Sequence, residues 1–345
     1  MTRLQRAGTP LDIEEQLTHP RSPLRSALFD SIFSPHAGPS TFILDHQDEN
    51  GQALGLAQMR VRPRRPERDV VFLSPALDTG NGSHAIWQRL LAQLCVQTAE
   101  RGSLRLYARL PLQSEELQVF RHVGFLEYGQ ENIYQLDRTL DRSGIEPTLQ
   151  LRPQQSSDSW GLQRLYAALA PRAVQNAEGL AQGQWDLARR SRAEQGHRYG
   201  YIWEVNGELL GALHIRAGKC GYWLRTLLHP DASDQAEALG QTALVLTASR
   251  PHLPVYFAFR HYESGWQHVL PDLGFEPLLS QTLVVKHMAV RMQTTTPVLM
   301  QALEKSSAEG VVPSLISRSD VALQPLTQNS QTRQRRRKKT FTSSR

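Results

Sequence analysis

The feature that most constrains this chain is an internal repeat. The hexapeptide NGQALG at 50–55 recurs as NGELLG at 206–211, which is 156 residues later. A Gly-Phe pair at 124–125 recurs at 274–275, which is 150 residues later. Because the landmarks recur in the same order and at nearly the same offset, the sequence predicts two tandem copies of one fold.

Composition places the chain among soluble globular proteins. The length of 345 residues suits two domains, and 40% hydrophobic with 21% charged residues is ordinary for such proteins. Cys95 and Cys220 fall in different copies and form neither a metal-ligand spacing nor a disulfide framework, so we expect no metal. Without a long apolar run or an apolar leader, we expect no membrane span and a cytoplasmic location.

The net charge of +6 comes from the end of the chain. Residues 331–345 contain seven basic residues and no acidic one, so the rest of the chain carries 6 − 7 = −1. We expect residues 293–345 to be a disordered tail, because they are rich in Ser, Thr and Gln. Weak polyanion binding through Arg333–Lys339 and a merely solubilising tail both fit this composition.

The first copy, residues 1–138, reads as an alternation of strands and helices. An Asn-Gly turn joins strands over 40–44 and 54–61, and a buried strand follows over 69–73. A helix is predicted over 85–101, and a strand over 104–110 follows it. A short helix over 114–122 and a last strand over 126–136 complete the copy.

The second copy, residues 148–292, repeats this order. The pattern predicts helices over 160–169 and 184–194, then an Asn-Gly hairpin of strands over 199–205 and 208–216. A strand over 222–228, a helix over 235–249 and a strand over 255–259 follow. A short helix over 265–273 and a strand over 278–288 end the copy.

A glycine loop is present in the first copy and absent from the second. The first copy has DTGNGSH at 78–84 between a strand and a long helix, whereas the second has DASDQA at 231–236. Amides at the start of a helix lack internal acceptors, and Gly80 and Gly82 would let a phosphate approach the backbone. A plain strand-to-helix turn explains the glycines equally well. In the second copy, Asp231 and Asp234 would repel a pyrophosphate.

The order of elements resembles the GNAT acetyltransferase superfamily. The resemblance implies an α+β fold in which each copy is a mixed, mostly antiparallel twisted sheet flanked by helices. It also implies that acetyl-CoA or another acyl-CoA binds with its pyrophosphate on the glycine loop and its pantetheine arm between strands 70–74 and 104–110. The cofactor-binding residues it implies are Leu73, Thr79, Gly80, Asn81, Gly82, Ser83, His84 and Gln113.

The match to the family is partial. Thr79 stands where the family usually has Arg or Gln, and Phe120 stands where a tyrosine often protonates the departing thiolate. Leu270 takes the equivalent place in the second copy, which we interpret as degenerate. Glu67 and Asp69, at the start of the central strand, are the leading candidates for the base that deprotonates the amine, although an acid at the end of a loop is more often simply solvated. The other candidates in the first copy are Glu127, Glu131, His84 and His122.

The resemblance therefore implies an acyl-CoA-dependent N-acyltransferase, most simply an N-acetyltransferase, acting on a small-molecule or peptide amine. The alternative is a catalytically inactive acyl-CoA-binding or scaffold protein whose basic tail contacts a polyanion. Neither the acceptor nor the oligomeric state follows from the sequence.

Overall fold

The computed structural model describes residues 8–20, 40–48, 51–62, 65, 67–77, 83–137, 147–179, 185 and 197–288, with the backbone alone at 46–48 and 51–53. We call 8–137 the first half and 147–288 the second half. The first half contains, in order, β1 (Thr9–Pro10), α2 (Ile13–Thr18), β2 (Ser40–Asp48), β3 (Gly51–Val61), β4 (Arg68–Ser74), α4 (Ser83–Glu100), β5 (Arg105–Pro111), α5 (Glu115–His122) and β6 (Leu126–Leu136).

The second half repeats this succession. Its elements are β7 (Arg152–Pro153), η2 (Ser156–Asp158), α6 (Ser159–Leu169), α7 (Arg172–Glu178), β8 (His197–Val205), β9 (Glu208–Ala217), β10 (Tyr222–Leu228), η3 (Pro230–Gln235), α8 (Ala236–Thr247), β11 (Val255–Arg260), α9 (Trp266–Asp272) and β12 (Glu276–His287).

The repeated sequence landmarks have local physical causes. Asn206 and Gly207 adopt φ values of 53° and 82°, the left-handed conformation that a tight hairpin turn requires. Gly124 and Gly274 end α5 and α9 with φ values of 87° and 83°. After Gly124, the amide of Phe125 returns to the Phe120 carbonyl at 3.0 Å, which turns the phenylalanine ring into the core.

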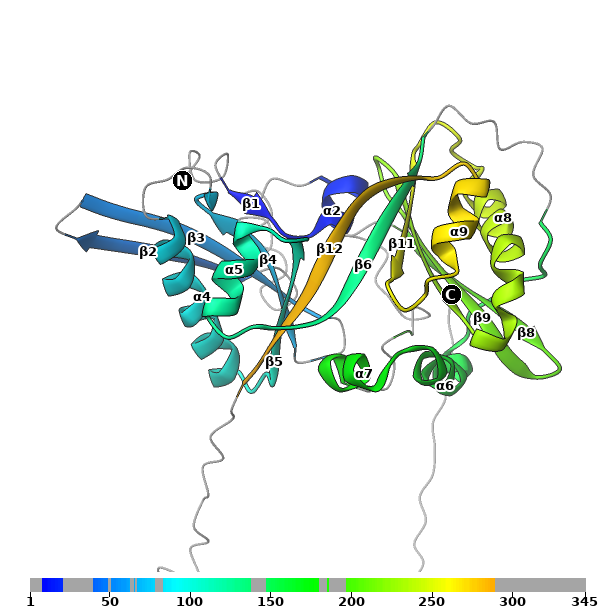
Figure 1. Cartoon of the computed structure of the whole chain (residues 1–345), viewed down its shortest axis with the longest axis horizontal. Helices are drawn as coiled ribbons and strands as arrows, with labels where there is room; N and C mark the ends of the chain where they lie inside the picture. The colour runs from blue at the N-terminus through cyan, green and yellow to red at the C-terminus, as the bar shows by residue number, and fades with distance from the viewer. Residues whose placement is uncertain are drawn as a thin grey trace, which may run out of the picture. The chain divides into compact units, whose positions relative to one another are not determined.

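The twelve described strands form one sheet that both halves share. Its order is β2-β3-β4-β5-β12-β6-β11-β10-β9-β8-β7, with β1 added on β4. β12, the last strand of the second half, lies between β5 and β6 of the first half, and β6 pairs in turn with β11. Figure 1 shows β12 and β6 side by side in the middle of this sheet. The two halves have exchanged their last strands, so the strand order is symmetric about the β12–β6 pair.

Each half buries its own apolar core on one face of the sheet. In the first half α4 and α5 pack there, with Trp87 and Phe120 fully buried. In the second half α8 and α9 do the same around Phe257 and Trp266. The opposite face is covered by α2, α6 and α7, and carries most of the buried charged side chains described below.

The predicted α+β class and element order are confirmed. The sequence analysis did not predict β1, α2 or α7, or the exchange of last strands. The predicted helix over 184–194, apart from residue 185, and the tail over 293–345 lie outside the described residues. The division into domains over 1–138, 148–292 and 293–345 stays a prediction.

Candidate functional site

Each half contains a fork between two parallel strands. In the first fork, β4 and β5 pair at Arg68–Leu106 and Asp69–Tyr107 and diverge beyond that point. In the second fork, β10 and β11 pair from Tyr222–Val255 to Leu224–Phe257. A strand that loses its neighbour leaves backbone amides and carbonyls free to bind an extended ligand.

The first fork is occupied by the chain itself. β1 pairs antiparallel with β4, with Thr9 opposite Leu73 and Pro10 opposite Phe72. The amide of Leu11 donates to the Val71 carbonyl at 2.9 Å. Since β3 holds the other edge of β4 at Phe72 and Leu73, these residues lie on the edge that β5 leaves free. The backbone edge of Leu73, the predicted contact of the pantetheine arm, is therefore already paired with the chain itself, while its side chain lies in the core of the first half.

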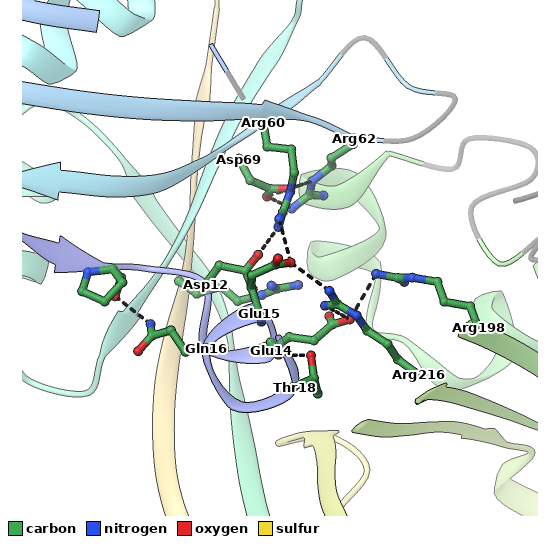
Figure 2. A network of polar contacts seen from close by, with 12 residues as sticks. Asp12, Glu14, Glu15, Gln16, Thr18, Arg60, Arg62, Asp69, Arg198 and Arg216 are labelled. Carbon is green, nitrogen blue, oxygen red and sulfur yellow. Dashed lines mark hydrogen bonds and ion pairs between the residues drawn. The ribbon is translucent and has the colours of Figure 1, made fainter. Parts of the chain in front are cut away.

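Helix α2 anchors this segment across both halves, and we call residues 8–19 the strap. Asp12 caps the helix by accepting from the Glu15 amide at 3.1 Å. In the first half Arg60 pairs with Asp12 and, at 3.5 Å, with Glu15. In the second half Arg216 contacts Glu14 at 2.9 Å and Glu15 at 2.8 Å, as Figure 2 shows.

Arg60 and Arg216 stand at equivalent places of the repeat, each ten residues after the Asn of its hairpin turn. Both guanidinium groups reach the carboxylates of α2 (Figure 2). Arg60 and Arg109 lower the pKa of Asp12 well below its ordinary value in spite of burial. Arg198 and Arg216 lower that of Glu14 in the same way. A network of ion pairs thus joins the strap to both halves.

Only some of the other predicted cofactor residues lie in the described part of the chain. Ser83 and His84 begin α4, and Gln113 precedes α5. Thr79, Gly80, Asn81 and Gly82 lie outside the described residues. Ser83 is buried and donates to the Leu77 carbonyl at 3.1 Å. His84 is about half exposed, with Nε2 3.9 Å from Glu115 Oε2 at the start of α5. Gln113, just before the Ser114 cap, is exposed and has a φ of 56°.

The two candidate bases each contact arginine. Glu67 is buried, 3.2 Å from Arg65 Nε and 3.3 Å from Arg105 Nη1. Asp69 receives two hydrogen bonds from Arg62 Nε, both 3.0 Å, and a third from Nη2 at 2.7 Å. The Arg62 charge lowers the pKa of Asp69 although burial opposes this, so Asp69 holds a proton weakly. Their role as bases stays a prediction.

Neither helix of the α5/α9 pair offers a proton donor at the place where the family often has a tyrosine. Phe120 is fully buried, with its ring 4.8 Å from that of Phe125 and 6.3 Å from that of Trp87. Leu270 is equally buried in the second half. Both side chains therefore pack in the apolar cores of their halves.

The second fork differs from the first. Between Arg225 and Leu228, no described strand other than β9 pairs with β10. Past the point of divergence, β10 and β11 carry Arg225 and Arg260, and the neighbouring β6 carries Glu131 directly opposite Arg260. Trp185 stacks near Arg225, whose guanidinium carbon lies 5.3 Å from the indole centroid.

Glu131 is the centre of what we call the central cluster, which comprises Arg109, Glu131, Arg225 and Arg260. The carboxylate lies 3.6 Å from Arg260, 3.9 Å from Arg109 and 4.0 Å from Arg225. Its Oε2 accepts a hydrogen bond from Gln281 at 2.5 Å, across the β12–β6 pair. Arginine charge lowers the pKa of Glu131 in spite of full burial.

Two further carboxyl groups border the central cluster. Glu178 of α7 accepts from Arg260 at 3.1 Å and from the Tyr166 hydroxyl at 2.7 Å. Glu263 accepts from the Arg260 amide at 2.6 Å. Burial raises the pKa of Glu263 to about 7, so that this group gains and loses a proton near neutral pH. A residue with that property can act as a general base.

The sequence analysis missed the strap, Glu263 and the members of the central cluster other than Glu131, which was among the candidate bases. The strap had a local signal, because Asp12 precedes two acids and the apolar residues Ile13 and Leu17 are four apart, as at a capped helix start. The central cluster had none, since its members come from four strands and meet only through the exchange of β6 and β12.

Within the part of the chain that the structure describes, no three His, Cys, Asp or Glu side chains are grouped so that they could hold a metal ion. Across the same residues, no helix combines the length and the apolarity needed to span a membrane. The predicted polyanion site at 333–339 lies outside them.

Comparison with known proteins identifies the fold. No protein-family model and no curated protein matches the sequence. Among solved structures, a GCN5-related N-acetyltransferase from Sphaerobacter thermophilus matches with a TM-score of 0.52 and 11% identity, covering 79% of this chain and 88% of that one.

Two further structures match at lower TM-scores. A tandem GNAT protein from the clavulanic acid biosynthesis pathway has a TM-score of 0.45 and 16% identity, over 76% of this chain and 87% of its own. A GNAT-family acetyltransferase from Colwellia psychrerythraea has a TM-score of 0.38 and 13% identity, over 81% and 99%. The Sphaerobacter structure alone of these three exceeds 0.5, and together with the strand order it identifies the fold of this chain as that of the GNAT superfamily.

Proposed function

We propose that this protein transfers an acyl group, most simply acetyl, from acyl-CoA to an amine. The observation that supports the proposal is the pair of parallel-strand forks in a GNAT fold, each followed by a helix that starts near the fork. In the reaction the amine nitrogen attacks the thioester carbonyl, the carbon–sulfur bond breaks, a base takes the proton of the amine, and the thiolate is protonated.

We place the CoA pyrophosphate at loop 79–84 of the first half, with its arm along Leu73 and near Gln113. This placement requires the strap to give up its pairing with β4, because one strand edge cannot pair with two partners. The charge of the pyrophosphate would meet the first amides of α4, an 18-residue helix long enough to have a full macrodipole.

Among the described carboxyl groups near a fork, Glu263 has the pKa best suited to deprotonating an amine at neutral pH, but it lies beside the second fork and not beside the first, where we place the cofactor. Asp69, with its lowered pKa, and Glu67, between two arginines, are weaker candidates. Because Phe120 and Leu270 have no proton to give, the thiolate would take its proton from water or from the substrate.

A thermal-shift titration with CoA and acetyl-CoA tests the cofactor assignment. We expect both to raise the melting temperature of the wild type, and Gly82→Asp to abolish the effect through lost space and added negative charge. Gly265→Asp is the matched control, since a Cβ at Gly265 meets nothing within 4 Å. Absence of any shift in the wild type would contradict acyl-CoA binding.

Release of free thiol from acetyl-CoA across a panel of amines tests the transfer itself. Turnover with any amine supports the proposal. Binding of acetyl-CoA without turnover would instead support the inactive acyl-CoA-binding protein.

A further inference from the structure

The strap pairs with β4 through one edge of a very short strand. β1 contributes two paired residues, and the Leu11 amide adds one hydrogen bond beyond them. Because bonding residues alternate along an antiparallel pair, Pro10 directs its backbone away from β4. Proline has no N–H, and the Pro10 carbonyl accepts from the Gln16 side chain at 3.2 Å. Among the described strands β1 pairs with β4 alone, so the strap is bound there along one edge only.

The other end of the strap is docked firmly on the second half. The Cys220 amide donates to the Thr18 carbonyl at 3.0 Å. A Cβ at Gly218 would lie 2.3 Å from that carbonyl, so the close approach depends on glycine. Ile13 and Leu17 pack against the buried side chains of β10 and β11, next to the ion pairs described above. Helix α2 therefore has a docking site of its own that does not involve β4.

Few side-chain contacts hold the β1 end in place. Of residues 8–11, Leu11 alone is buried, at 5% exposed, and its side chain lies in the core of the first half. Segments with few buried apolar contacts and few hydrogen bonds open at a lower free energy than the rest of a protein. Residues 8–11 can thus leave β4 without the release of α2.

The segment that opens most easily covers the edge where we place the cofactor arm. The pantetheine arm of CoA contains two amide groups, which can pair with a strand edge as a peptide does. The edge of β4 at Phe72 and Leu73 pairs with β1, and one edge cannot pair with both partners. Acyl-CoA and residues 8–11 therefore compete for the same backbone groups.

We propose that residues 8–11 are an autoinhibitory segment, which closes the first fork against acyl-CoA and opens while α2 stays docked on the second half. The assignment rests on the proposed acyl-CoA binding at this fork and adds its regulation. Only the open form binds the cofactor. If the segment is open in about one molecule in ten, the apparent affinity is about tenfold below that of the open fork.

A reversible disulfide tests the closed state. Pro10 and Phe72 form a non-hydrogen-bonded pair, the kind in which side chains lie closest, so cysteines there can be bridged. The full chain with Pro10→Cys and Phe72→Cys also carries Cys220→Ser, which removes an exposed thiol. CoA is titrated by calorimetry into the oxidised and the reduced protein, and mass spectrometry confirms the bond.

We expect the oxidised protein to bind CoA at least about tenfold more weakly than the reduced protein, and reduction to restore the affinity. Cys220→Ser alone, treated in the same way, should bind CoA equally well before and after reduction. Equal affinity of the oxidised and reduced double-cysteine protein would overturn the inference.

A second variant favours the open state. Leu11→Ala removes the side chain that holds the segment in the core and should tighten CoA binding by up to about tenfold. Leu253→Ala shortens a buried leucine in the core of the second half and should leave CoA binding unchanged, which controls for general loosening. Unchanged or weaker CoA binding in Leu11→Ala would contradict the inference.

Hydrogen exchange followed by NMR tests the opening without any CoA. We expect the Leu11 amide to exchange at least about tenfold faster than the His19 amide, which donates to the Glu15 carbonyl at 2.8 Å within α2. Both rates are corrected for the intrinsic exchange of each residue. A common rate for the two amides would show that the strap opens only as a whole and would overturn the inference.

The titrations also separate this inference from the proposed function. Equal CoA binding by the oxidised, the reduced and the Leu11→Ala proteins would support acyl-CoA binding and reject the autoinhibitory segment. No CoA binding by the reduced and the Leu11→Ala proteins would reject both, because a fork that is open would then still not accept the cofactor.

Discussion

The two forks show how one fold can diverge within a single chain. The first half has the glycine loop, yet the β4 edge of its fork is paired with residues of the strap. The second half lacks the glycine loop, yet between Arg225 and Leu228 its β10 edge pairs with no described strand but β9. The presence of a glycine loop therefore does not show whether the strand edge beside it is free, because residues from another part of the chain can pair with that edge.

The halves also differ in how they hold the strap. Arg216 in the second half is 3% exposed and contacts both Glu14 and Glu15, whereas its counterpart Arg60 is 24% exposed. Burial makes an ion pair harder to break, because a carboxylate left alone in a dry site is strongly destabilising. The second half thus provides the firmer anchor.

The largest effect is expected from breaking that anchor. Arg216→Met should lower the free energy of unfolding by about 3 kcal/mol, since it removes the shortest ion pairs of Glu14 and Glu15, which are only 15% and 16% exposed. Arg60→Met should cost clearly less, about 2 kcal/mol, because Arg60 is partly solvated. Urea unfolding measures both, and equal losses would show that the two anchors are equivalent.

The next largest effect should be a pH dependence of stability that comes from Glu263 in the second half. The folded pKa of Glu263 is about 7 and its ordinary value is 4.5, so the native state keeps a proton that the unfolded chain has released. Stability due to this group is fully present below pH 4.5 and is lost as pH rises to 7, by about 3 kcal/mol. Glu263→Gln should flatten the stability profile between these limits.

The control for that profile lies in the first half. Glu100→Gln changes an exposed carboxylate at the end of α4 and should leave the profile between pH 4.5 and 7 as in the wild type. A wild-type profile that is already flat over this window would contradict the assignment to Glu263.

A moderate effect is expected from restoring the tyrosine of the family. Phe120→Tyr places a hydroxyl among Trp87 and Phe125, where the described core is apolar, and should destabilise the protein by about 2 kcal/mol. Thiol release should not increase, because the side chain at 120 is fully buried against Trp87 and Phe125. A rise in turnover with unchanged stability would show that Phe120 borders the thioester.

The smallest effect tests the strap itself. A Cβ at Gly8 would lie 2.1 Å from the Phe72 ring, so Gly8→Ala should cost about 1–2 kcal/mol and loosen the pairing of β1 with β4. CoA affinity should then rise, because the edge of β4 becomes free. Gly265→Ala meets no neighbour and should leave CoA binding unchanged. Weaker CoA binding in Gly8→Ala would show that the strap supports the cofactor site instead.

Much of the architecture could be predicted because its signals are local. The Asn-Gly turns, the glycine after each short helix and the spacing of apolar residues in α4 determine where elements begin and end. The order of these elements was sufficient to indicate the GNAT fold. Residues of the glycine loop could be named from their motif in the same way, and their role stays a prediction.

Only the tertiary structure decided which strand edges meet. β6 and β12 follow equivalent helices and carry similar patterns, so nothing local determines which of them pairs with β5. That choice depends on contacts between residues about 150 positions apart. It brings Glu131 beside Arg260 and Gln281, and it places three arginines from both halves around one carboxylate.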